Sequence, residues 1–276
     1  MDISKVLIIG KDSAIAQEIQ FGIKLSHKDL DITKIEDVKK ALLKYNPSAV
    51  LCLASVDLNN SEKNPSLAYE VNVLGLCNVA TEALELNIPI IIISSGAIFN
   101  GKAGEHFDEN HLPNPLNIYG KTKYLAELIL QRITKNFLII RTGWLFGLSY
   151  KKSGFSKFID YLINSESLSG IKATDDSTGS PTYIVDFIDE LKKLIQSNSK
   201  GIFHIANSNC GSAYDVVKEV ASIKNKKNLV EVVNTNFTAS VGIPARSESE
   251  CLISNKIKLR PWQGALKDYY LKIKNH

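Results

Sequence analysis

Three residues able to carry proton chemistry stand in order along the middle of the chain: Ser95, Tyr119 and Lys123. Tyr119 and Lys123 are four positions apart, a spacing that places two side chains on one face of a helix. An ordinary tyrosine, with a pKa of about 10, is a poor proton shuttle at neutral pH, and a nearby ammonium lowers that pKa. A serine hydroxyl adds a hydrogen bond to the substrate oxygen. Such a set suits proton donation to a ketone that receives a hydride.

The spacing of Tyr119 and Lys123 does not by itself single out this pair. The same spacing occurs at Tyr214/Lys218 and at Tyr270/Lys274. Only Tyr119 and Lys123 follow a predicted strand, at 89–94, that runs into Ser95. In a doubly wound sheet, ligands bind at the carboxyl ends of the strands. We therefore expect the three side chains to meet there, on one side of a crevice.

The elements that would position this set alternate between strand and helix. Continuous β-branched runs predict strands at 5–10, 22–26, 49–54, 89–94 and 136–142, and periodic apolar residues predict helices at 14–21, 36–45, 66–86 and 118–135. Continuous rather than alternating apolar runs are typical of strands that are buried on both faces. With right-handed crossovers, this order predicts an α/β fold with a doubly wound, Rossmann-type parallel sheet.

The regular alternation of strands and helices ends after about residue 145. Further helices are expected at 184–196 and 212–223, and short strands at 201–206 and 229–233. We predict a dinucleotide-binding domain over 1–145 and a mostly substrate-binding lobe over 146–276. The chain is expected to return to the sheet within 170–206.

The first strand-to-helix turn reads IIGKDSAIA and predicts a pyrophosphate site at Gly10, Ser13, Ala14 and Ile15. Only the first of the three glycines of the strong motif is present, because Ser13 and an alanine hold the other two positions. A second interpretation is that Asp12 or Ser13 caps the following helix. Both interpretations can hold together.

The end of the second strand bears on which nicotinamide cofactor is used. A carboxylate there would suit the ribose hydroxyls of NAD, whereas basic groups would suit the extra phosphate of NADP. His27 and Lys28 slightly favour NADPH over NADH. We also place Asp31, Ile32 and Ala54 along the cofactor.

Composition excludes several other classes of protein. The 276 residues carry a net charge of +4 that is spread along the chain, which argues against a nucleic-acid partner. No apolar run approaches the roughly 20 residues of a membrane span, and no signal peptide is visible at the start. The four cysteines show no metal-ligand spacing and favour a reducing cytoplasm. We expect a cytoplasmic protein without a metal site.

The catalytic set resembles that of the short-chain dehydrogenase/reductases, and the run YEVNVLGLCNVATEAL (69–84) resembles their extended members. Further segments resemble the dTDP-4-dehydrorhamnose reductase family. They are PLNIYGKTKYLAE (115–127), RTGWLFG (141–147), GSPTYIVDF (179–187), GIFHIA (201–206), PARSES (244–249) and LRPWQGALKDY (259–269). These segments follow in order over almost the whole chain.

The resemblance implies an NADPH- or NADH-dependent reduction of a 4-keto-6-deoxy sugar nucleotide, and the family suggests a homodimer. It assigns the proton to Tyr119 and the nicotinamide ribose to Lys123. Asn72 would lie at the cofactor and Gly96 at the substrate. The remaining two residues implied at the substrate are Trp144, facing the sugar or lying in the interior between the lobes, and Arg246, near the diphosphate.

Departures from the family pattern leave two other functions open. The chain has SGAIF (95–99) where the family has Thr-Asp-Tyr-Val-Phe, and ASVDLNN (54–60) where it has Ala-Tyr-Thr-x-Val-Asp. The run SSGAIFNG (94–101) resembles a motif of sugar-nucleotide epimerases of the same superfamily. A non-catalytic, NAD(P)-binding regulatory protein on the same fold is the other alternative.

Overall fold

The computed structural model describes every residue of the chain except 149–153, 227–230, 235–243 and 276. Its centre is a sheet of six parallel strands in the order β10-β5-β4-β3-β1-β2. The strands are β1 (Val6–Ile9), β2 (Ile23–Leu25), β3 (Ala49–Cys52), β4 (Ile90–Ser95), β5 (Phe137–Thr142) and β10 (Gly201–Ile205). This parallel sheet confirms the predicted doubly wound α/β fold.

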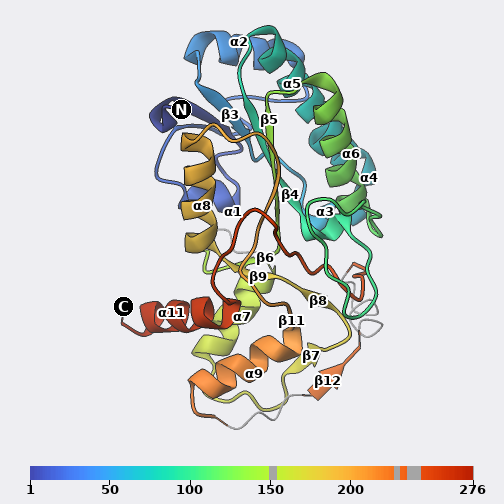
Figure 1. Ribbon diagram of the computed structural model, residues 1–276, viewed down its shortest axis with the longest axis vertical. Helices are drawn as coiled ribbons and strands as arrows, with labels where there is room; N and C mark the ends of the chain where they lie inside the picture. Colours follow the sequence, from blue (N-terminus) through green and yellow to red (C-terminus); the bar gives the residue numbers. More distant parts are fainter. Residues whose placement is uncertain (149–153, 227–230, 235–243, 276) are drawn as a thin grey trace.

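Helices cover both faces of the sheet (Figure 1). Helices α2 (Ile35–Tyr45), α5 (Leu76–Glu85) and α6 (Ile118–Ile133) lie on one face, and α1 (Ala14–Glu18) and α8 (Ile184–Gln196) lie on the other. Successive strand residues point to opposite faces, so Leu7 and Ile9 join one apolar core while Val6 and Ile8 join the other. The continuous apolar runs therefore reflect burial on both sides.

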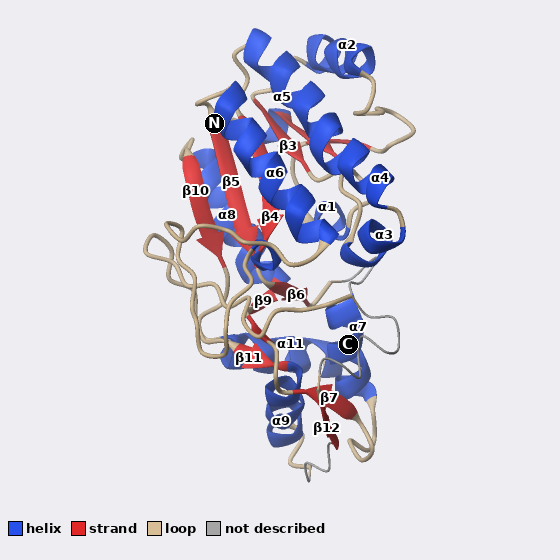
Figure 2. Cartoon of the chain, turned by 90° about the vertical axis from the view of Figure 1, so that its right-hand side faces the viewer, coloured by secondary structure: helices blue, strands red, loops and turns tan. Residues whose placement is uncertain are grey.

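A smaller lobe follows the carboxyl edge of the sheet (Figures 1 and 2). Its helices are α7 (Gly154–Asn164), α9 (Ala213–Ile223) and α11 (Trp262–Lys274). Its short strands pair as β6 (Trp144–Phe146) with β9 (Pro181–Tyr183), β8 (Thr178–Gly179) with β11 (Gly211–Ser212), and β7 (Lys172–Thr174) with β12 (Glu231–Val233). One of the two sheet cores continues into this lobe through Phe146, Ile159 and Trp262, so the lobe packs directly on the sheet.

Two of the predicted helices differ from the structure. The helix expected at 66–86 is divided into α4 (Pro65–Tyr69), a π-helical segment η2 (Glu70–Gly75) and α5, and a separate helix α3 (Leu58–Lys63) precedes it. A π-helical turn inserts one extra residue, which apolar spacing does not reveal. The first helix, expected at 14–21, ends at Glu18 because the chain must turn at Gly22, where φ is +76°.

The later strands show what the apolar pattern captures. β10 lies within the expected 201–206 run and joins the main sheet beside β5. The run at 229–233 contains β12, although residues 227–230 fall outside the described part of the chain. Strands β6 to β9 and β11 have two or three residues each, too few to show periodicity. Among the described residues, no helix combines the length and apolar character required of a membrane span.

Candidate active site

Strand β4 and helix α6 bring the first two predicted catalytic residues together. Asn117 caps α6 by accepting a hydrogen bond from the Gly120 N–H at 2.8 Å. The backbone of Gly120 lies so close to β4's exit that an added Cβ would approach the Ala97 carbonyl oxygen to 2.2 Å. This contact places the phenol of Tyr119, in the first turn of α6, against the Ser95 hydroxyl, to which it is hydrogen-bonded.

Lys123 lies one turn further along α6 and is half-buried, like Tyr119. Burial is the main cause that lowers the pKa of Lys123, while the Cys52 thiol and the Glu127 carboxylate act in the opposite direction. Burial also raises the pKa of Cys52 to about 11, so that thiol stays protonated at neutral pH. Lys123 thus stands near the end of β3 as well as beside the Tyr119 helix face.

Burial raises the pKa of Tyr119 to about 12, outweighing the Ser95 hydrogen bond and Arg246, which both lower it. Asp57 and Glu250 raise it further. We expected Lys123 to lower this pKa, but Lys123 is not among the groups with the largest effect. The phenol is therefore protonated at neutral pH, the form that can donate a proton.

The turn after β1, where a phosphate site was predicted, contains a tightly packed glycine and the alternative helix cap. Gly10 adopts φ +95°, and a Cβ there would approach the backbone nitrogen of Ala54 to 2.7 Å. Ser13 caps α1 by accepting a hydrogen bond from the Ala16 N–H at 3.2 Å, which confirms the capping interpretation. Ala14 and Ile15 begin the helix and are half-buried.

Three residues beyond β2 were expected along the cofactor, and they differ in exposure and in their contacts within the protein. His27 is exposed in the loop after β2. The Asp31 carboxylate accepts hydrogen bonds from the backbone N–H and hydroxyl of Thr33 at 3.1 and 2.7 Å. Ile32 is buried and occupies the space beside Gly75, where a Cβ would come within 2.6 Å of it.

Asn72 is buried within the π-helical segment. Its Oδ1 accepts a hydrogen bond from the Val56 N–H at 2.7 Å, and its Nδ2 donates to the Thr122 hydroxyl at 2.9 Å. These bonds join the loop after β3 to α6, the helix that carries Tyr119. Asn72 therefore fixes the position of that loop relative to the helix that carries the predicted catalytic pair.

The three residues expected at the substrate converge on an acidic residue that sequence reasoning missed, Glu250. The Trp144 indole N–H donates to Oε2 of Glu250 at 3.3 Å, and Nη1 of Arg246 lies 3.2 Å from the same oxygen. Gly96 lies directly against the Glu250 backbone: a Cβ on Gly96 would come within 2.9 Å of the Glu250 carbonyl oxygen. Trp144 is half-buried and packs against Phe155. The only sequence signal for Glu250 was its position four residues after Arg246.

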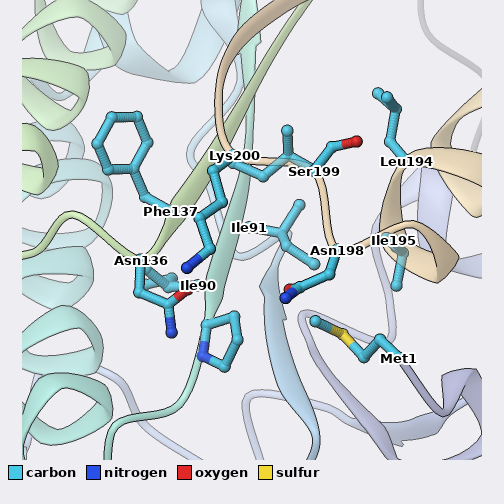
Figure 3. Close-up of a pocket in the computed structure, with 12 residues that line it drawn as sticks. Met1, Ile90, Ile91, Asn136, Phe137, Leu194, Ile195, Asn198, Ser199 and Lys200 are labelled. Atoms are coloured by element: carbon cyan, nitrogen blue, oxygen red, sulfur yellow. The ribbon is translucent and has the colours of Figure 1, made fainter.

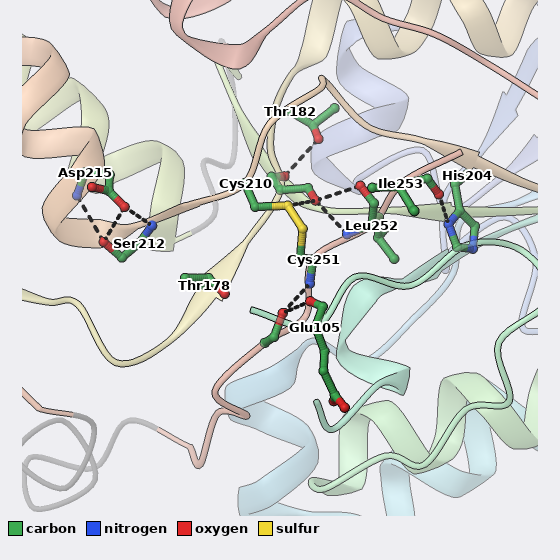
Figure 4. Close-up of a disulfide and its surroundings, with 12 residues drawn as sticks. Glu105, Thr178, Thr182, His204, Cys210, Ser212, Asp215, Cys251, Leu252 and Ile253 are labelled. Carbon is green, nitrogen blue, oxygen red and sulfur yellow. Dashed lines mark hydrogen bonds between the residues drawn. A yellow bond between two sulfur atoms is a disulfide. The ribbon is translucent and has the colours of Figure 1, made fainter. Parts of the chain in front are cut away.

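A disulfide joins Cys210, just before β11, to Cys251, next to Glu250 (Figure 4). This bond differs from the expectation of four cysteines in a reducing cytoplasm, because residues 41 positions apart approach only once the lobe has folded. His106 is the third member of the one cluster of potential metal-ligand side chains found in the described parts of the chain. Its two cysteines are bonded to each other, so the cluster offers no thiolate pair.

A small pocket lies at the opposite, amino-terminal edge of the sheet (Figure 3). It is bordered by the first residues of β4 and β5, Ile90 and Phe137, and by Met1, Asn136 and Lys200. The predicted catalytic set lies at the other end of the sheet. This pocket therefore has no part in the chemistry considered below.

Comparison with known proteins gives consistent matches over almost the whole chain. The family model "RmlD substrate binding domain" matches residues 4–275. A dTDP-4-dehydrorhamnose reductase from Aggregatibacter actinomycetemcomitans is 30% identical over 88% of this chain and 87% of the relative. The spore coat polysaccharide biosynthesis protein SpsK of Bacillus subtilis is 28% identical, covering 96% of both chains.

Solved structures agree with these relatives. The crystal structure of dTDP-4-dehydrorhamnose reductase from Bacillus anthracis in complex with NADP has a TM-score of 0.87 at 27% identity and covers 97% of this chain and 98% of its own. A Thermus thermophilus UDP-glucose 4-epimerase in complex with NAD has a TM-score of 0.70 at 17% identity, covering 96% of this chain and 98% of its own. The second likeness is one of fold alone.

Proposed function

Because the chain belongs to the RmlD substrate binding domain family, we propose that it reduces the 4-keto group of a 4-keto-6-deoxy sugar nucleotide, as dTDP-4-dehydrorhamnose reductases do. It is an NAD(P)-dependent oxidoreductase. The observation that carries the proposal is the hydrogen-bonded pair of Ser95 and Tyr119 at the carboxyl edge of the sheet.

The turn after β1 fits a nicotinamide dinucleotide. The Gly10 backbone lies too close to Ala54 for a Cβ at position 10, and the first turn of α1 follows a few residues later. Gly10, Ser13 and Ala54 would hold the pyrophosphate side, and Lys123 would hold the nicotinamide ribose. When bound, the cofactor supplies the hydride.

The protein's own side chains bind the substrate and supply the proton. Ser95 donates a hydrogen bond to the ketone oxygen, and Tyr119 transfers its proton to that oxygen as negative charge develops. Lys123 is not among the main influences on the Tyr119 pKa in the cofactor-free protein. Its ammonium, one turn further along α6, would favour the phenolate that remains after proton transfer. Trp144 and Arg246 contribute to the sugar-nucleotide site from the lobe formed mostly by residues 146–276.

We propose NADPH as the preferred cofactor on the basis of the loop after β2. His27 and Lys28 are exposed there, where they can meet an additional phosphate. The nearest carboxylates are already engaged, because Asp29 accepts hydrogen bonds from Ser26 and Asp31 accepts them from Thr33.

The test is turnover of NADPH or NADH with dTDP-4-dehydrorhamnose, in the wild type and in Tyr119→Phe. The variant lacks the proton donor, so kcat should fall by about 10²- to 10⁴-fold while NADPH still binds in a calorimetric titration. Tyr214→Phe is the matched control, because Tyr214 has a lysine four residues later but lies in the lobe, on α9. It should retain full turnover.

The same measurements separate the alternative functions. Steady consumption of NADPH contradicts a redox-neutral epimerase, which would retain its cofactor through the cycle. A wild-type protein that binds NADPH but reduces no sugar nucleotide would support a regulatory role. Full turnover in Tyr119→Phe would contradict the assignment of the proton donor.

A further inference from the structure

Glu250 is a buried acid at the edge of the proposed substrate site. Its side chain is 4% exposed, whereas the side chain of its partner Arg246 is 30% exposed. A buried carboxylate is costly unless charged or hydrogen-bonding partners compensate it, and both of its partners are residues expected at the substrate. Trp144 donates to it at 3.3 Å and Arg246 lies 3.2 Å away.

The backbone fixes Glu250 relative to the catalytic strand. Its N–H donates to the Thr178 carbonyl oxygen at 2.8 Å, and its own carbonyl oxygen lies against Gly96, directly after Ser95. The next residue, Cys251, is tied to Cys210 by the disulfide. The carboxylate is therefore a rigid anchor, while Arg246 and Trp144 are the more exposed groups that it orients.

The pairing also changes what Arg246 offers to a ligand. A free guanidinium attracts the anionic diphosphate of a sugar nucleotide. With Glu250 beside it, the pair has no net charge and presents oriented N–H groups rather than a free cation. An uncharged, hydrogen-bonding surface next to an indole suits the hydroxyl groups and ring of a sugar.

The geometry points to Glu250 as a specificity-determining positioning residue, which anchors Trp144 and Arg246 toward the sugar and prevents Arg246 from acting as a free cation toward the diphosphate. This inference rests on the proposed function. It predicts that loss of the Glu250 charge affects recognition of the sugar and of the nucleotide in opposite directions.

The test is calorimetric titration of dTDP and of dTDP-rhamnose, the reduced product, into the wild type and Glu250→Gln, each with NADP present. Glu250→Gln should bind dTDP about two- to fivefold more tightly, because the freed Arg246 is a partly exposed charge. Its preference for dTDP-rhamnose over dTDP should fall about five- to tenfold, because an uncharged amide oxygen holds Arg246 and Trp144 less strongly than a carboxylate does.

Three variants separate this mechanism from general effects. Glu248→Gln removes the same charge from an exposed residue of the same segment and should change neither affinity. Glu250→Gln/Arg246→Gln should lose the tighter binding of dTDP, because the freed cation is gone. Trp144→Phe removes the indole N–H together with part of the ring and should also lower the preference for dTDP-rhamnose. An unchanged preference in Trp144→Phe overturns the inference even where Glu250→Gln fails to fold.

The inference is overturned when both affinities are unchanged in Glu250→Gln, or when both weaken equally, as a merely structural role would cause. A wild type that binds dTDP-rhamnose no more tightly than dTDP overturns it as well. These are binding measurements, so they decide the role of Glu250 even where turnover fails. An absence of turnover with normal titrations contradicts only the proposed function.

Discussion

At the scale of single residues, the protonation state of Tyr119 decides whether the site can act as an acid. Burial raises its pKa to about 12, above the ordinary value. The folded protein therefore holds this proton at pH values where an unfolded chain, with a pKa of about 10, has lost it. Stability from this group is complete below pH 10 and is lost as the pH rises toward 12.

We predict that Tyr119 forms no tyrosinate below about pH 10 in the cofactor-free protein. The measurement is the difference in tyrosinate absorbance between the wild type and Tyr119→Phe during an alkaline titration. The difference should appear only in the range near pH 12. A tyrosinate signal near pH 7 to 8 would instead show that Lys123 dominates over burial, as the spacing alone suggested.

At the scale of secondary structure, the start of α6 sets the position of the proposed catalytic pair. A Cβ on Gly120 would come within 2.2 Å of the Ala97 carbonyl oxygen, so Gly120→Ala must move the helix away from the end of β4. Misplacement of reacting groups by about 1 Å costs about 10²-fold in rate. We expect kcat to fall by about that factor.

Gly264→Ala is the matched control for Gly120→Ala. Gly264 is also helical, on α11, but an added Cβ there would have no atom within 4 Å. It should keep full turnover and gain up to about 1 kcal/mol in the free energy of unfolding. Unchanged turnover in Gly120→Ala would show that the contact with Ala97 does not position Tyr119.

A buried ion pair holds the far part of α6 against β5. Arg141 Nη2 lies 2.7 Å from Glu127 Oε2, with side chains that are 3% and 0% exposed. Glu127→Gln would leave a buried guanidinium without its counter-charge, so we expect the free energy of unfolding in urea to fall by about 3–5 kcal/mol. Glu190→Gln, which breaks the pair with the exposed Lys193, should change it by less than about 1 kcal/mol. Equal changes in the free energy of unfolding would show that the buried pair contributes no more than the exposed one.

The elements also show what could be predicted from the sequence. Strands buried on both faces leave continuous apolar runs, and their parallel order brings Ser95 and Tyr119 to one edge without further information. Glu250 could not be found in this way, because its partner Trp144 lies 106 residues earlier and they meet only in the folded lobe. The division of 66–86 was missed because the π-helical turn keeps an apolar spacing close to that of an α-helix.

At the scale of the whole molecule, the C-terminal segment connects the lobe to the sheet. Residues 244–252 carry Arg246 and Glu250, and they form bridges to Gly101, Phe107 and Thr178. The proposed catalytic pair comes from the first half of the chain, whereas Arg246 and Glu250 come from near its end. The site is therefore complete only when residues 244–252 have packed against the carboxyl end of β4.

The disulfide between Cys210 and Cys251 stabilises this return. It closes a loop with a sequence separation of 41 residues, for which the chain-entropy estimate is about 4 kcal/mol and typical measured values are about 2–4 kcal/mol. We predict that Cys210→Ser, or reduction of the wild type, lowers the free energy of unfolding by an amount in this range. Cys77→Ser, at a half-buried free cysteine, should change the free energy of unfolding much less.

Thiol titration of the unreduced, unfolded wild type should detect two reactive groups, Cys52 and Cys77, because the other two are bonded to each other. Detection of four thiols, together with no change on reduction, would show that the end of the chain is held in place by packing and hydrogen bonds alone.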